Sequence, residues 1–328
     1  MDARPPRMLV IVNHVAAKAR RAWPAIKSIL TENEIEFETH VTTRAGDATD
    51  AARAALRAGC ELVAVVGGDG TLSEAASGFF ALDESVAIGD VPSQISSKAA
   101  LAILPAGTGD DFARGLRGGR EPLESWASAL VNYCRSPHES KTRVVDVIYG
   151  SANDGANSFI CINVVTVGLG AQVAGRVAAQ GRMMQSLPGE ARFVAAACGA
   201  LLAWRERTVR VSVDEDEAIE CRSNLLAVAN GIYAGGGMMF APAARVDDGK
   251  LDVLVSCNIT RATILRELPR IRRGAHLSNP NVRAIAATRV SIETSGDDNA
   301  LPIEADGNVR GQTPARFRIM PGALRIVL

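Results

Sequence analysis

The stretch Val65–Gly78, VVGGDGTLSEAASG, decides the fold of the N-terminal part of this chain. It ends an apolar run that begins at Leu62, wraps glycines around one acidic residue, and leads into a helical pattern from about Leu72 to Phe80. A fully apolar run of this length is typical of a strand buried on both faces of a parallel sheet. Glycines after such a strand bring backbone N–H groups and the next helix N-terminus close to an anion. We therefore predict a phosphate-binding loop that contains Asp69, at the carboxyl end of a central strand.

A second stretch, Ile103–Leu116, repeats this design with the sequence ILPAGTGDDFARGL. Its apolar run ends in a Gly-Thr-Gly loop, in which the hydroxyl of Thr108 can donate to a phosphate. Asp110 and Asp111 then open a helix, where a capping role and a functional role both stay open. Two such loops on neighbouring strands predict one shared site.

The rest of the chain indicates two kinds of fold. Apolar strands that alternate with helical stretches up to about residue 142 predict a doubly wound α/β domain. Beyond that point, short strands separated by turns predict an antiparallel sandwich or barrel, with helical stretches around Glu190–Arg205 and Arg261–Arg273.

Composition excludes several classes of protein. The 36 basic and 36 acidic residues of the 328-residue chain cancel, so no global charge directs it to nucleic acid. No apolar run reaches the roughly 18 to 20 residues that span a bilayer. The six cysteines form no CxxC pair, which predicts reduced thiols in the cytosol. The sequence lacks the GxxxxGK motif of P-loop proteins and the GxSxG motif of α/β-hydrolases. It also lacks the HExxH motif of common zinc enzymes and, after a strand, the GxGxxG motif of dinucleotide reductases, so all four classes are disfavoured.

The two loops, GGDGTLSE and GTGDDFARG, resemble those of the diacylglycerol kinase catalytic-domain family, which includes sphingosine kinases and bacterial soluble lipid kinases. Val228–Val255, VANGIYAGGGMMFAPAARVDDGKLDVLV, is similar to a later segment of the same family. The resemblance implies an α/β nucleotide domain over residues 1–142, to which about 319–328 return. It also implies a β-sandwich acceptor domain over 143–318, with the active site in the cleft between the two.

The resemblance further implies ATP and Mg²⁺ as cofactors and assigns roles by position. Asp69 would be the catalytic base, with Asp111 and Asp306 as further catalytic candidates. A structural magnesium site would use Asp248 and the backbone carbonyls of Arg245 and Lys250. Without the resemblance, the stretch Asp247–Asp248–Gly249 favours an ordinary β-turn. The expected ATP contacts are Asn13, Thr42, Gly68, Asp69, Gly70, Thr71, Leu72, Ser73, Glu74 and Thr108.

The chain departs from the family pattern at several positions. The first loop, from Asn13 to Ala17, lacks the Pro and Gly of the usual NPxxG, and Lys18 could compensate. Asn308 stands where the late DGE motif has its Glu, and an amide cannot accept a proton. Asp69 would then act alone, or Asp306 or Glu304 would take over. A non-catalytic lipid- or nucleotide-binding regulator is the alternative that these departures favour.

The expected reaction is phosphoryl transfer from ATP to a lipid hydroxyl. Diacylglycerol is the default acceptor, while a sphingoid base, phosphatidylglycerol and another long-chain alcohol stay open. An NAD kinase ranks lower, because it would lack the Val228–Val255 segment. The arginine-rich stretch Ala262–Gly274 suits either an anionic membrane surface or a core-packed helix with a solvated basic face. We expect a cytosolic protein in peripheral contact with the inner face of the membrane, with no nucleic-acid partner, and leave a homodimer open.

Overall fold

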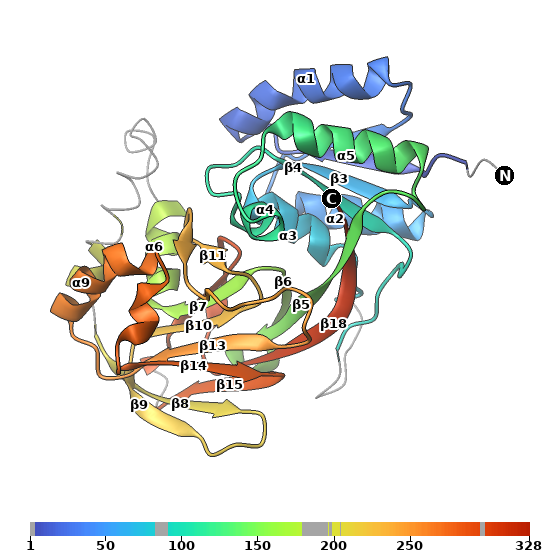
Figure 1. The fold of residues 1–328 in the computed structure, drawn as a ribbon. Coiled ribbons are helices and arrows are strands. Elements are labelled where there is room, and N and C mark those ends of the chain that lie inside the picture. The colour runs from blue at the N-terminus through green and yellow to red at the C-terminus, as the bar shows by residue number, and fades with distance from the viewer. Residues whose placement is uncertain (1–3, 83–90, 179–195, 197–198, 204, 296–298) are drawn as a thin grey trace. The chain divides into compact units, whose positions relative to one another are not determined.

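The computed structural model describes residues 4–82, 91–178, 196, 199–203, 205–295 and 299–328. Its internal contacts divide the chain into two compact units (Figure 1). The first unit comprises residues 1–147 and 320–328, and the second comprises residues 148–319. Two long strands, β5 (Thr142–Ala152) and β18 (Ala315–Val327), therefore contribute residues to both units.

The first unit contains a parallel sheet in the order β2-β1-β3-β4-β18. The bounds of its other strands are β1 Met8–Val12, β2 Glu38–Val41, β3 Leu62–Gly67 and β4 Ala100–Pro105. Every residue of β1 and β3 is buried, as expected for strands covered on both faces. Among residues 320–328, the Gly322 N–H donates to the Asp146 carboxylate at 2.7 Å, which holds the end of β18 beside β5.

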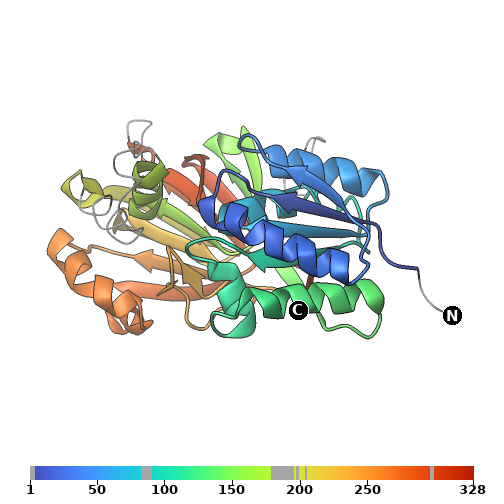
Figure 2. The same cartoon turned by 90° about the horizontal axis from the view of Figure 1, so that it is seen from above.

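Helices cover both faces of this sheet. They are α1 (Ala17–Glu32), α2 (Asp47–Arg57), α3 (Asp69–Ser77), α4 (Asp111–Arg117) and α5 (Leu123–Arg135). α1 packs beside α5 and α2 packs beside α3, so the two pairs form separate layers (Figures 1 and 2). The doubly wound α/β prediction is confirmed. α3 begins at Asp69, three residues before the predicted start at Leu72, because the apolar pattern of a helix does not reveal its first turn.

Among its described residues, the second unit has two large antiparallel sheets that share a buried cluster, and β11 pairs with β12 in a small separate sheet. One sheet has the order β14-β13-β10-β7-β16-β17, and the other pairs β18 with β15, β15 with β8, and β8 with β9. Side chains from both sheets, such as Val211 of β8 and Val253 of β13, share one buried cluster. This arrangement is a β-sandwich, which decides between the two predicted architectures. The bounds are β6 Asn157–Cys161, β7 Val164–Gly168, β8 Arg207–Val213, β9 Ile219–Ser223, β10 Leu225–Ala229, β11 Tyr233–Ala234, β12 Met238–Met239, β13 Leu251–Ser256, β14 Val282–Ala287, β15 Arg289–Thr294, β16 Pro302–Ala305 and β17 Asn308–Gln312.

Helices lie against this sandwich in the part of the chain that the structure describes, and most of the helical stretch predicted around Glu190–Arg205 lies outside that part. α6 (Leu169–Ala178) follows β7 and packs on β16 and β17, and α9 (Arg261–Ile271) follows β13. Among the described residues of the chain, no helix is both long enough and apolar enough to span a membrane.

Candidate active site

The two glycine loops of the first unit are in direct backbone contact. β3 and β4 are parallel neighbours, with Gly67 opposite Pro105, so both loops leave the same edge of the sheet. A Cβ built on Gly107 would lie 2.6 Å from the Cα of Gly68, which is closer than two carbon atoms can approach. Position 107 therefore requires glycine, and a Cβ on Gly68 would lie a tight 3.1 Å from the Gly107 Cα, so the predicted shared site has a physical basis.

Asp69 and Asp111 carry their carboxylates to the same place in this site. Asp69 is the first residue of α3, and its Oδ1 accepts a hydrogen bond from the Phe112 N–H at 3.1 Å. A Cβ built on Gly109 would lie 3.0 Å from Oδ2 of Asp69 and 3.2 Å from Oδ2 of Asp111, so the two acids flank that glycine. Burial, followed by the negative charge of Asp111, raises the pKa of Asp69 to about 7. Asp69 can therefore exchange a proton near neutral pH.

Cationic side chains surround the second loop. Lys18 donates from Nζ to the Gly107 carbonyl at 3.0 Å, and Arg120 donates to the Thr108 carbonyl at 2.6 Å. Burial raises the pKa of the Asp110 carboxyl, while the Gly107 N–H and these two cations oppose the rise. Lys18 was suggested by the sequence, but Arg120 was missed, since no motif distinguishes it from the many other arginines.

Asn13 links the first loop to α3. Its Nδ2 donates to Oγ1 of Thr71 at 2.8 Å, and its Oδ1 accepts from the Ala16 N–H at 3.1 Å, just before α1. These bonds position the start of α1 and commit the Asn13 side chain to contacts within the protein.

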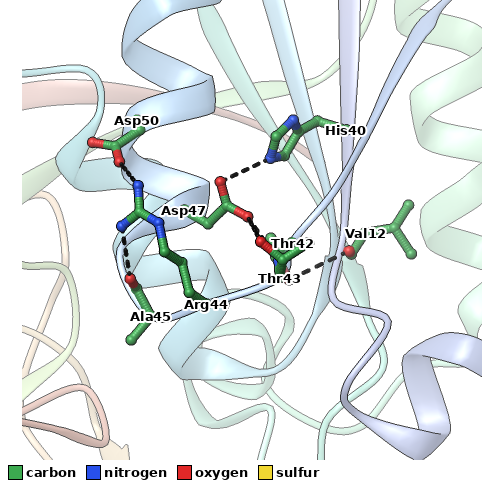
Figure 3. A network of polar contacts seen from close by, with 8 residues as sticks. All are labelled: Val12, His40, Thr42, Thr43, Arg44, Ala45, Asp47 and Asp50. Carbon is green, nitrogen blue, oxygen red and sulfur yellow. Dashed lines mark hydrogen bonds and ion pairs between the residues drawn. The ribbon is translucent and has the colours of Figure 1, made fainter.

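Thr42 lies at the carboxyl end of β2, where its N–H donates to the Val12 carbonyl at 3.0 Å (Figure 3). Asp47 holds the loop that follows, because its carboxylate accepts from the Thr43 N–H at 2.7 Å and contacts His40 Nε2 at 3.1 Å (Figure 3). These bonds, led by the one from the Thr43 N–H, lower the pKa of Asp47. The network thus places Thr42, 7% exposed, beside the end of β1.

The other expected ATP contacts lie along α3. Thr71, Leu72 and Ser73 have buried side chains, whereas Gly68, Gly70 and Glu74 are half-buried. The Ser73 hydroxyl is fully buried, and none of the described residues hydrogen-bonds to it. The backbone of this turn is thus better placed than the side chains of Leu72 and Ser73 to meet a nucleotide.

In the second unit, Asp306 holds the connection between β6 and β7. Its carboxylate accepts from the backbone N–H groups of Ile162, Asn163 and Val164 at 2.8, 3.1 and 3.2 Å. It is only 6% exposed. These bonds favour a positioning role, and the catalytic role of Asp306 stays a prediction.

Glu304 is the second carboxylate that titrates near neutrality. Its side chain accepts from the Thr166 hydroxyl at 2.6 Å and from the Gly307 N–H, and burial raises its pKa to about 7. Asn308 begins β17 close by, and its buried Nδ2 has no hydrogen-bond partner in the part of the chain that the structure describes. Glu304 is therefore an ionisable group four residues before Asn308, and its taking over the role of the family's late Glu stays a prediction.

The expected magnesium residues lie in the turn before β13. The Lys250 N–H donates to Oδ1 of Asp248 at 3.1 Å, and Arg245 pairs with Asp247 at 3.6 Å. Burial and the charge of Asp248 raise the pKa of Asp252. A cation bound here would therefore reduce the repulsion between the carboxylates of Asp248 and Asp252. The described residues contain no group of three His, Cys, Asp or Glu side chains suited to a metal. A site with carboxylate and carbonyl ligands is still compatible with the oxygen ligands that Mg²⁺ prefers.

Comparison with known proteins covers nearly the whole chain. Residues 7–149 match the diacylglycerol kinase catalytic domain, and residues 163–328 match the YegS C-terminal NAD kinase beta sandwich-like domain. The chain is 32% identical over 286 residues to "Probable lipid kinase YegS-like" of Chromohalobacter salexigens, covering 87% of this chain and 81% of that protein. It is 25% identical over 282 residues to "Diacylglycerol kinase" of Bacillus subtilis, covering 86% and 82%.

A solved structure supports the fold. The crystal structure of a diacylglycerol kinase from Bacillus anthracis str. Sterne aligns with a TM-score of 0.66 at 19% identity, covering 99% of this chain and 97% of that one. At this identity the likeness concerns the fold alone. The sequence matches over both units, however, show that the chain belongs to the diacylglycerol kinase family of lipid kinases.

Proposed function

We propose that this kinase transfers the γ-phosphoryl group of ATP to a hydroxyl group of diacylglycerol, with Asp69 as the base. The observation that carries the proposal is the Asp69 carboxylate between two glycine loops in backbone contact, with a pKa of about 7. A carboxyl with this pKa is deprotonated in a large fraction of molecules at neutral pH and still attracts a hydroxyl proton. The name of the Bacillus subtilis relative supports diacylglycerol as the acceptor.

The loops would bind the triphosphate mainly through backbone groups. The first turn of α3 has N–H groups without partners inside the helix, and its N-cap Gly68 has no side chain to occupy them. Lys18 and Arg120 add positive charge beside the second loop. Since phosphoryl transfer depends mostly on positioning and charge stabilisation, these groups supply what the step requires.

Magnesium would be held by carboxylate oxygens of this unit, of which Asp111 is the nearest to Asp69. When bound, it would neutralise charge on the phosphates. Asp69 would then orient the attacking hydroxyl and take its proton. Because Asn308 cannot accept a proton, no second base is expected from that position.

The test is transfer of label from ATP. Purified protein would be incubated with γ-labelled ATP and Mg²⁺ in mixed micelles that contain diacylglycerol, sphingosine, phosphatidylglycerol or NAD, each in a separate reaction. We expect label in diacylglycerol and its loss in Asp69→Asn. The matched control, Asp216→Asn, alters an exposed carboxyl in the β8–β9 turn and should keep full activity.

The other outcomes separate the alternatives. Label in sphingosine or phosphatidylglycerol would replace the acceptor and keep the mechanism, whereas label in NAD would overturn the lipid assignment. If ATP binds but no acceptor is labelled, Asn308→Glu is the next variant to assay. If Asn308→Glu also labels no acceptor, the result would favour a non-catalytic regulator that binds lipid or nucleotide.

A further inference from the structure

One segment of the second unit concentrates positive charge in a chain whose total charge is zero. Residues 257–283, which include α9, hold six arginines and a single carboxylate, Glu267. Glu267 is 7% exposed and pairs with Arg270 at 2.9 Å. The remaining arginines give this part of the surface a strong positive field.

The charge is arranged around an apolar stripe on the exposed side of α9. The helix buries Ile264, Glu267 and Ile271, which lie on one side at helical spacing. The residues on the opposite side are exposed: they are Ala262, Leu265, Arg266, Pro269, Arg272 and Arg273, and we call them the α9 outer face. Ala262, Leu265 and Pro269 run along the middle of this face, and the arginines flank them.

Two features distinguish this face from an ordinary solvated one. Leu265 is 54% exposed, one of the few large apolar side chains to be so among the described residues. Of the carboxylates that the structure describes, none pairs with Arg266, Arg272 or Arg273. Several exposed arginines elsewhere in this unit do have carboxylate partners, such as Arg210 with Glu220 at 3.4 Å. Within the described residues, the α9 outer face therefore combines an apolar stripe with three arginines that no carboxylate pairs.

We propose that the α9 outer face binds the surface of an anionic lipid bilayer. The arginines would contact anionic headgroups, while Leu265 and Pro269 would enter the boundary between headgroups and acyl chains. With 11 residues, α9 is too short to span a bilayer, so it would lie in the plane of the interface. The apolar stripe favours a lipid surface over nucleic acid, whose phosphate backbone would leave Leu265 in water. The inference builds on the proposed lipid kinase function, since it places the enzyme where a lipid acceptor resides.

The test measures binding of the full-length protein to vesicles by co-sedimentation. Vesicles of phosphatidylcholine alone are compared with vesicles that also contain phosphatidylglycerol, at low and high salt. Each arginine at an anionic surface strengthens partitioning about fivefold, so the triple variant R266Q/R272Q/R273Q should lose at least tenfold. Leu265→Ser should weaken binding and leave its salt dependence unchanged.

The matched control is R210Q/R289Q/R316Q. It removes the same charge from the same unit, but its arginines pair with Glu220, Glu215 and Asp154. We expect its binding to stay within about twofold of wild type, because these cations are already compensated. Equal losses in both triple variants would mean that only net charge matters and would overturn the proposal. Unchanged binding of R266Q/R272Q/R273Q, binding to phosphatidylcholine alone, or preference for a DNA duplex over anionic vesicles would overturn it as well.

Failure of this proposal is distinguishable from failure of the kinase proposal. A short-chain, water-soluble diacylglycerol can be phosphorylated without a surface, so R266Q/R272Q/R273Q should keep wild-type activity on it. If wild type phosphorylates this acceptor but does not bind anionic vesicles, the α9 proposal fails and the kinase proposal stands. If wild type binds anionic vesicles as expected but phosphorylates no acceptor, the kinase proposal fails and the α9 proposal stands.

Discussion

Replacing Asp69 by Asn should abolish catalysis and stabilise the protein at the same time. The charged carboxylate is disfavoured by burial and by Asp111, which together raise its pKa from 3.8 to about 7. A difference of about 3 pKa units corresponds to an upper limit of about 4 kcal/mol, at about 1.4 kcal/mol per unit. Partial access to solvent reduces this, so we expect Asp69→Asn to raise the free energy of unfolding by about 2 to 4 kcal/mol above pH 7. Asn keeps an acceptor for the Phe112 N–H.

The stability that Asp69→Asn gains over wild type should increase as the pH rises. The pKa of Asp69 is higher in the folded state than in the unfolded state, so between about pH 4 and pH 7 the folded wild type holds one more proton. Wild-type stability therefore falls as the pH rises through this window, and Asn at this position removes that fall. Urea unfolding of both proteins should show almost no difference near pH 4 and the full difference above pH 7. Turnover should drop at least about a hundredfold, the loss expected for a missing base.

Asp47→Asn is a control for which we expect a change in stability opposite to that of Asp69→Asn. Hydrogen bonds, first from the Thr43 N–H, lower the pKa of Asp47, so its charge stabilises the folded state at neutral pH and the benefit is lost in acid. Asp47→Asn should therefore destabilise the protein at neutral pH. The reasoning is wrong if Asp69→Asn is no more stable than wild type above pH 7, or if both variants shift in the same direction.

Two other predictions concern backbone contacts. Gly107→Ala forces a Cβ to 2.6 Å from Gly68 Cα and from Asp110 Oδ1, which should destabilise by about 1 to 3 kcal/mol and raise the KM for ATP. Its control, Gly115→Ala in α4, meets nothing within 4 Å and should keep the KM and leave the thermal midpoint equal to or slightly above that of wild type, because Ala favours the helix. Asp306→Asn weakens the acceptor for the backbone N–H groups after β6, and should cost about 1 to 3 kcal/mol in thermal unfolding. An unchanged thermal midpoint would contradict the anchoring role.

Local patterns predicted the α/β order and the two glycine loops, because an apolar run and the glycines after it are neighbours in sequence. The contact between Gly68 and Gly107 depends on β3 lying beside β4, which the sequence indicates only through the repeated design. The first turn of α3 was missed because Asp69 and Gly70 precede the apolar periodicity.

Contacts between distant residues could not be predicted from the same patterns. Asp306 binds backbone groups of residues 162–164, more than 140 positions earlier, and nothing in its local sequence distinguishes that role from catalysis. The raised pKa of Asp69 likewise requires its burial and the approach of Asp111, which lie in the folded state alone. The motif therefore identified the residue, and only the structure explains its protonation.

The energetic disadvantage of Asp69 is itself an argument for its function. A buried carboxyl with a pKa of about 7 destabilises the fold at neutral pH, and an amide of the same shape would not. Groups that are costly in this way are concentrated at sites where the charge does chemical work. Asn308 shows that this chain carries an amide where the family pattern has an acid, so an ionisable group at position 69 calls for a separate reason. If Asp69→Asn gained stability and kept full turnover, that reason would have to be something other than proton transfer.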